Sequence, residues 1–174
     1  MEYTFTLKYQ LGPDEGDMHA VVERLAESGC DDALVGIGLP GRIALAFTRE
    51  AKDARAAVYS ALEDVRRGIP SAVLIEIGPD LAGLTDIAGI VGVSRQNMRK
   101  LMLAHAASFP PPLHEGTTSL WHLVDVLSWL QSKAGYRIDP SMLELAHVTM
   151  QVNAVREGRR VPRGLSRELL ARIG

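Results

Sequence analysis

The stretch that decides the fold, residues 84–101, reads LTDIAGIVGVSRQNMRKL. Its apolar residues recur at helical spacing in two stripes, namely Leu84, Ile87, Ala88 and Val91, then Met98 and Leu101. Gly92 lies between the stripes, where a tight turn needs a residue that tolerates positive φ. Thr85 and Ser94 each precede a helical run and are expected to cap it. The pattern predicts a helix-turn-helix.

The second helix of this motif presents polar and cationic side chains, which hydrogen-bond base edges and neutralise phosphates in DNA complexes. The residues expected to reach base edges in the major groove are Ser94, Arg95, Gln96 and Asn97. Those expected to contact phosphates are Arg99, Lys100 and Thr85. The alternative is an ordinary helical hairpin with a solvated polar face.

The segment after the motif has the composition of a wing. Residues 109–121 read FPPPLHEGTTSLW, and the three prolines favour an extended backbone. Glu115 and Gly116 are expected to turn, and the chain then returns as a short strand. The candidates for contact with the DNA backbone are His114, Thr117 and Thr118. These three are equally compatible with a solvated loop.

Residues 84–130 resemble the small winged helix-turn-helix domain of the phage excisionase and prophage-regulator group, which is related to MerR-type domains. The residues that carry the resemblance are Leu84-Thr85, Ile87-Ala88, Gly92-Val93-Ser94-Arg95, Phe109-Pro110, Trp121, Asp125-Val126 and Trp129-Leu130. The resemblance implies a winged domain that binds DNA. The chain departs from the family pattern because Asp86 lies earlier than the family's acid in the first helix, and because the wing lacks arginine.

Further helices are expected towards the C-terminus. Leu123 to Leu130 carry a helical stripe, and Asp139-Pro140 opens a second helix that runs to about Gly158. Ser141 and Glu144 have the spacing of a capping box in that helix. A basic stretch at residues 159–163 is either a second phosphate patch or a solvated tail. A short helix is expected from Ser166 to Ile173.

The helix after Pro140 is expected either to be a dimer seam or to pack on its own wing domain, and the dimer seam is the favoured reading. A rough heptad is formed by Met142, Leu145, Ala146, Thr149 and Val152. Apolar residues lie on more than one face of the helix, and Leu143, Val148 and Met150 are the others. An exposed apolar patch of this kind marks an interface. Operators are commonly read by two-fold symmetric dimers. We therefore expect a homodimer that binds an inverted repeat.

The first 77 residues have a different pattern. Tyr3, Phe5, Leu7, Tyr9 and Leu11 alternate with polar residues, which is typical of a strand with one apolar face. Further strands are expected at 33–37, 43–47 and 72–77, with helices at 18–26 and 54–65. The order β-α-β-β-α-β predicts a ferredoxin-like sandwich, an antiparallel sheet with both helices on one face. The expected fold class is therefore α+β.

The charge is unevenly divided along the chain. Residues 1–80 carry 8 Lys and Arg against 14 Asp and Glu, a net charge of −6, whereas residues 81–174 carry 11 against 7, a net charge of +4. This polarity is expected if only the second half meets phosphate. We place a ferredoxin-like interaction or sensing domain at 1–77 and a winged helix-turn-helix domain with a C-terminal helical extension at 81–174.

No cofactor, metal site or catalytic group is expected. Residues 36–41, GIGLPG, match G-x-G-x-x-G, but strand-like alternation follows instead of the helix that a pyrophosphate site needs. The five histidines show no ligand spacing with each other or with Cys30. No Ser or Cys has a recognisable base. We therefore expect a protein that is not an enzyme.

The compartment is expected to be the cytoplasm. A single cysteine excludes an internal disulfide, and no apolar run approaches the roughly 18 residues of a membrane span. Strand-like alternation begins directly after Met1, so no signal peptide is expected.

Together these observations predict a sequence-specific DNA-binding transcriptional regulator, a class that includes antitoxin-like and phage-defence repressors. Its partners would be double-stranded DNA and a second copy of the chain. Two alternatives stay open. In the first, the helix-turn-helix is the scaffold of a protein-interaction adaptor, with a protein partner at the N-terminal domain. In the second, the protein is a ligand-responsive regulator whose N-terminal domain senses a small molecule, as ACT-like domains do.

Overall fold

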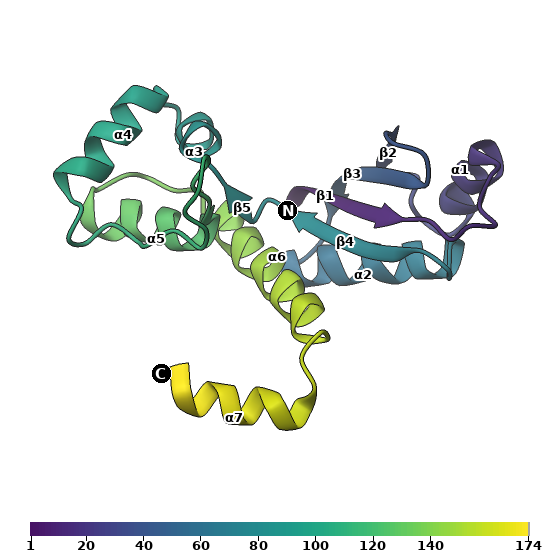
Figure 1. Cartoon of the computed structure of the whole chain (residues 1–174). Helices are drawn as coiled ribbons and strands as arrows, with labels where there is room; N and C mark the ends of the chain where they lie inside the picture. The colour runs from purple at the N-terminus through teal and green to yellow at the C-terminus, as the bar shows by residue number, and fades with distance from the viewer. Residues whose placement is uncertain (174) are drawn as a thin grey trace.

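The computed structural model describes residues 1–173 and has a mixed α+β architecture (Figure 1). The first half of the chain consists of β1 (Glu2–Gln10), α1 (Met18–Glu27), β2 (Ala33–Ile37), β3 (Arg42–Glu50), α2 (Ala54–Gly68) and β4 (Val73–Gly78). The expected β-α-β-β-α-β order is confirmed. The fourth strand begins and ends one residue later than the sequence pattern predicts.

These four strands form one antiparallel sheet in the order β2-β3-β1-β4. Side chains alternate across the sheet, so β1 presents four buried residues to one face, Tyr3, Phe5, Leu7 and Tyr9. Phe5 lies opposite Phe47 of β3, and their rings stack with centroids 5.3 Å apart. The opposite face carries exposed polar side chains such as Thr4, Lys8 and Thr48.

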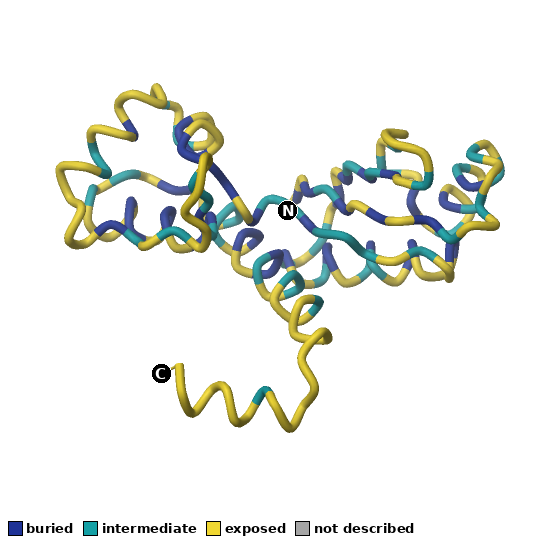
Figure 2. Tube along the Cα trace, in the orientation of Figure 1, coloured by how far each residue is buried: buried dark blue, intermediate teal, exposed yellow. Residues whose placement is uncertain are grey.

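Helices α1 and α2 cover the apolar face of the sheet. Val21 and Leu25 of α1 and Val58 of α2 are fully buried in this first core. Asp17 and Asp53 begin the two helices by accepting hydrogen bonds from backbone N–H groups of the first turn. The buried positions of α2 follow one side of the helix (Figure 2), as its sequence pattern predicts.

The second half of the chain is mainly helical. It consists of β5 (Leu81–Ala82), α3 (Leu84–Ile90), α4 (Arg95–Ala104), β6 (Trp121–His122), α5 (Leu123–Lys133), α6 (Pro140–Gly158) and α7 (Arg163–Ile173). The short strands β5 and β6 pair antiparallel, which the sequence does not reveal. The last helix begins three residues before the expected Ser166.

A second core lies between α3, α4 and α5. Ile87, Met98 and Leu127 are fully buried there. Phe109 packs edge-on against Trp129 with ring centroids 5.0 Å apart, and Trp121 Nε1 donates to the Pro110 carbonyl at 3.0 Å. These aromatic contacts hold the proline segment onto the core.

Helix α6 packs against both cores, so the favoured dimer seam is wrong. The alternative, a helix packed on its own wing domain, is confirmed in part, because α6 also packs on the first core. Leu145 and Val148 belong to the first core, whereas Ala146 belongs to the second. Thr149, another residue of the expected seam, is completely buried. The helix has apolar residues on more than one face because two cores of the same chain contact it from different sides.

The junction between the halves is held by polar contacts around Asp80, which is 3% exposed. One oxygen of its carboxylate lies 2.7 Å from His122 Nδ1, and the other accepts a hydrogen bond from Asn153 Nδ2 at 2.7 Å. The Asn153 side chain also accepts from the Ile77 N–H at 3.0 Å and donates to the Ile77 carbonyl at 2.8 Å. Asn153 thereby pairs part of the free edge of β4 and fixes α6 to the sheet.

Helix α7 projects away from both cores (Figure 1), and none of its described side chains is buried (Figure 2). Its exposed apolar residues are Leu165, Leu169, Leu170 and Ile173. Arg159 and Arg160, just before it, are also exposed. Within residues 1–173, no helix has the length and apolar character that crossing a membrane requires.

Candidate nucleic-acid interface

The turn between α3 and α4 has the geometry that the sequence predicts. Gly92 has φ +73°, in the left-handed region where glycine is favoured. The Val93 N–H donates to the Ala88 carbonyl at 2.9 Å, which satisfies the end of α3. The expected turn at Gly92 is confirmed, and it places α3 and α4 next to each other (Figure 1).

The start of α3 differs from the expectation. The helix begins at Leu84, with Gly83 in the cap position, so Thr85 lies inside the first turn and does not cap it. The Asp86 carboxylate instead accepts a hydrogen bond from the Gly83 N–H at 2.9 Å. This acid lies three residues after the cap, the spacing from which a side chain can reach back to the cap N–H. The predicted Thr85 cap is wrong, and the Thr85 side chain is exposed.

The start of α4 agrees with the expectation. Ser94 Oγ accepts a hydrogen bond from the Asn97 N–H at 3.1 Å and caps the helix. Met98 is fully buried and anchors the helix on the second core. Because one side of α4 is fixed in this way, its other side faces solvent.

The exposed side of α4 brings together the predicted contact residues. All of them are exposed, namely Arg95, Gln96, Asn97, Arg99 and Lys100. Within residues 1–173, none of the three cations among them forms an ion pair. The sequence has no acid between Asp86 and Glu115. The helix therefore presents three positive charges with no carboxylate on the same segment.

The expected wing is a loop closed by a single antiparallel bridge. The His114 N–H donates to the Leu120 carbonyl at 3.2 Å, and the Leu120 N–H donates to the His114 carbonyl at 3.0 Å. The prolines before His114 lack N–H groups, which limits any longer ladder. The candidate residues His114, Thr117 and Thr118 are exposed on this loop.

The other motifs of the chain take structural positions. Gly36 lies in β2, and Gly41, with φ +75°, lies in the turn before β3, so no helix follows the glycines. Cys30 is buried, and burial raises the pKa of its thiol, whereas a nucleophilic cysteine needs a lowered one. Among residues 1–173, no three His, Cys, Asp or Glu residues are grouped as a metal site would require.

Two arginine arrangements were missed by the sequence reasoning. Arg49 is 7% exposed and binds Asp32 and Asp64 inside the first half, although these three residues are far apart in the chain. Arg66 and Arg156 line a common groove, described below. The doublet Arg159-Arg160, which lines the same groove, is a local signal for it in the sequence.

Comparisons of the chain with protein-family models, with curated proteins and with solved structures gave no significant match. The geometry of α3 and α4 is therefore the basis for the functional proposal.

Proposed function

We propose that this protein binds double-stranded DNA sequence-specifically, as a transcriptional regulator, with α4 as its recognition helix. The observation that carries the proposal is the exposed side of α4, where Arg95, Arg99 and Lys100 have no acidic partner within residues 1–173. Phosphate neutralisation by such cations supplies much of the affinity of DNA-binding proteins.

The dimensions of α4 are compatible with the major groove. The helix has 10 residues, so it is about 15 Å long, and the groove of B-DNA, about 12 Å wide, admits an α-helix. Arg95, Gln96 and Asn97 form its exposed first turn. Arginine pairs with guanine, and glutamine or asparagine pairs with adenine, through two hydrogen bonds each. These three residues are the proposed base readers, together with the O–H of Ser94.

The proposed phosphate contacts are Arg99 and Lys100, one turn further along α4. Thr85 is also exposed, but the Asp86 carboxylate lies beside it at the start of α3. A phosphate at that helix end would meet this negative charge. His114 on the loop is a further proposed backbone contact, with Thr117 and Thr118.

The fold proposal has the same two parts as the sequence expectation. The strand order β2-β3-β1-β4, with α1 and α2 on one face, supports a ferredoxin-like first half. The α3–turn–α4 geometry and the loop closed at His114 and Leu120 support a winged helix-turn-helix like that of the excisionase group. A homodimer stays part of the proposal, with an interface outside the buried faces of α6.

A binding-site selection with the purified full-length protein tests the proposal. We expect enrichment of one DNA sequence and an affinity that falls as salt concentration rises. Arg95→Ala should weaken binding to the selected site by about 1–3 kcal/mol and relax its sequence preference. Arg137→Ala is the matched control, because Arg137 is exposed in the same half but lies outside α4.

Two results would contradict this role of α4. If no DNA is retained at low salt, or if Arg95→Ala and Arg137→Ala have the same effect, α4 is not a recognition helix. A polar face that captures a protein and no DNA would support the adaptor alternative.

A further inference from the structure

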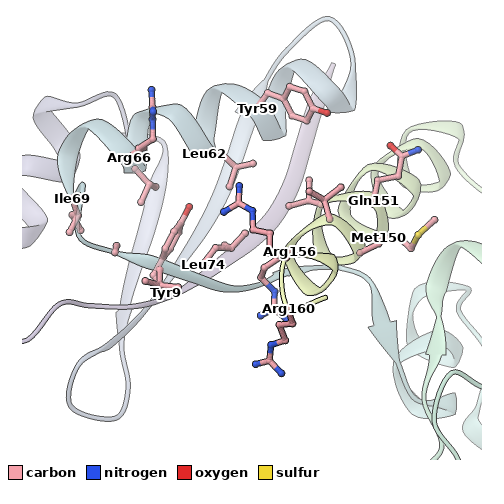
Figure 3. A pocket seen from close by; sticks show the side chains of 17 residues that line it. Tyr9, Tyr59, Leu62, Arg66, Ile69, Leu74, Met150, Gln151, Arg156 and Arg160 are labelled. Atoms are coloured by element: carbon pink, nitrogen blue, oxygen red, sulfur yellow. The ribbon is translucent and has the colours of Figure 1, made fainter. Parts of the chain in front are cut away.

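A large groove lies between α2, β4 and the C-terminal half of α6 (Figure 3), with a volume of about 980 Å³. Its apolar lining comes from all three elements, with Leu62 and Val65 from α2, Leu74 from β4, and Val152 and Val155 from α6. Ligand sites of small molecules commonly have volumes of about 300–1,000 Å³ and a mainly apolar lining. The groove therefore has the size and the surface of a small-molecule site.

The charged residues that line the groove are all arginines. Arg66 of α2, Arg156 of α6, and Arg159 and Arg160 after α6 line it, and no Asp or Glu within residues 1–173 does. The Glu157 carboxylate, outside the lining, contacts Arg156 and lies 3.4 Å from Arg160 Nε. One acid therefore faces two of the four arginines, and the groove keeps a positive charge.

Arg156 has an unsatisfied donor at this position. Its Nε is buried and, within residues 1–173, has no hydrogen-bond partner. A buried donor without an acceptor costs free energy, and native structures rarely leave one unpaired. Figure 3 shows the Arg156 side chain extending from α6 across the groove towards Leu62 on α2. An anionic group bound between the two helices would supply an acceptor where the guanidinium lies.

We propose that this groove binds a small organic anion that has an apolar body and a carboxylate head. The apolar body lies against Leu62, Leu74 and Val152, and the carboxylate accepts hydrogen bonds from the Arg156 guanidinium. Charge-assisted bonds between arginine and carboxylate are the strong class of protein hydrogen bonds. Arg66 and Arg160 add long-range attraction for the same charge.

Two larger occupants fit less well. A partner helix has a diameter of about 10–12 Å with its side chains, and Arg156 crosses the space in which it would lie. Helix α7, from the same chain or from a second copy, carries Arg163, Arg167 and Arg172 against one acid, Glu168. Its net positive charge would be repelled by the arginines of the groove.

Calorimetric titration of the full-length protein with sodium decanoate, below its micelle concentration, tests the proposal. Decyltrimethylammonium is the control of opposite charge, with an alkyl chain one carbon longer. We expect saturable binding of decanoate, with no heat of binding for the cation. Arg156→Gln should weaken decanoate binding by about tenfold or more, the effect of losing a hydrogen bond between charged groups.

Two further variants separate a binding defect from a folding defect. Arg66→Gln changes an exposed residue of the groove and should weaken decanoate binding several-fold without changing Tm. Arg167→Gln changes an exposed arginine of α7 outside the groove and should leave binding unchanged. Tm and far-UV circular dichroism of each variant check that the fold is retained.

Several results would overturn the proposal: no saturable decanoate binding, equal binding of decanoate and the cation, or equal losses in Arg66→Gln and Arg167→Gln. Binding of an acidic amphipathic peptide in place of decanoate would identify the groove as a protein-docking surface and would also overturn it. All measurements are made without DNA, so their outcome is independent of the proposed function of α4.

Discussion

Replacing Arg49 by methionine should destabilise the protein severely, because its guanidinium is the centre of a buried polar cluster. Nε and one terminal nitrogen donate to the two oxygens of Asp32 at 2.7 and 2.8 Å. The other terminal nitrogen donates to Asp64 at 2.7 Å and to Ser60 Oγ at 3.0 Å. The Gly29 carbonyl accepts a further hydrogen bond at 2.8 Å. Methionine keeps an apolar stem of similar length and removes all of these donors.

The expected loss is about 3 kcal/mol. Removing one partner of a buried ion pair costs about 3–5 kcal/mol, because the other charge stays buried without compensation. Two features place Arg49→Met at the lower end. The Asp32 side chain is 29% exposed and can regain water, and Asp64 keeps a second contact with Arg67. The hydrogen bonds with Asp32 raise the pKa of Arg49 above its already high ordinary value, so the cation persists at every pH at which the protein is handled.

Urea denaturation followed by far-UV circular dichroism measures this loss. With a slope of about 2 kcal/mol/M, a loss of about 3 kcal/mol lowers the midpoint by about 1.5 M. The control is Arg42→Met, on the same strand, because the Arg42 side chain is exposed and, within residues 1–173, makes a single long hydrogen bond, 3.4 Å, with Gln10. The control should change stability by less than about 0.5 kcal/mol.

Tryptophan fluorescence adds a second readout, because Trp121 and Trp129 both lie in the second core. Since α6 packs against both cores, the fluorescence midpoint should fall together with the circular-dichroism midpoint in Arg49→Met. Equal stabilities of Arg49→Met and Arg42→Met would refute the importance of the cluster. A fluorescence midpoint that stays in place while the circular-dichroism midpoint falls would refute the coupling through α6.

Three further predictions concern the turn, the buried thiol and the DNA contact. Gly92→Ala should lower stability in thermal unfolding by about 1 kcal/mol because φ is +73°, although within residues 1–173 no atom beyond the adjoining residues lies within 4 Å of the new Cβ. Gly89→Ala, inside α3 and equally free of clashes, should cause no loss, and equal effects of the two substitutions would contradict the backbone argument. Burial raises the pKa of Cys30, so above about pH 9 the unfolded thiol loses its proton while the folded one keeps it, and the free energy of unfolding should fall as pH rises. In urea denaturation this fall should be absent in Cys30→Val, and its persistence in that variant would assign it to another titratable group. Lys100→Ala should weaken binding to all DNA sequences similarly, and in a filter-binding titration it should reduce the slope of log binding constant against log salt concentration by about one. A loss of affinity confined to one sequence would instead make Lys100 a base reader.

The sequence by itself determined the elements whose signal is local. The alternation of Tyr3, Phe5, Leu7 and Tyr9 predicts β1 because period two is a property of a single strand. Gly92 and Ser94 fix a turn and a helix start through their own backbone and side-chain chemistry, and both were predicted at the right residues. The exposed polar residues of α4 also follow from periodicity, because Met98 must face a core.

Only the tertiary structure decided which surfaces meet. Pairing of β5 with β6 joins two-residue strands that are about 40 positions apart, and such short strands have no period to detect. The Arg49 cluster likewise joins Arg49 of β3 to Asp32, in the turn before β2, and to Asp64 of α2. The apolar pattern of α6 favoured packing against a second copy of the chain, whereas the helix packs against two cores of the same chain. Periodicity shows that a face must be buried, whereas the partner that buries it depends on contacts between distant segments, which no local pattern encodes.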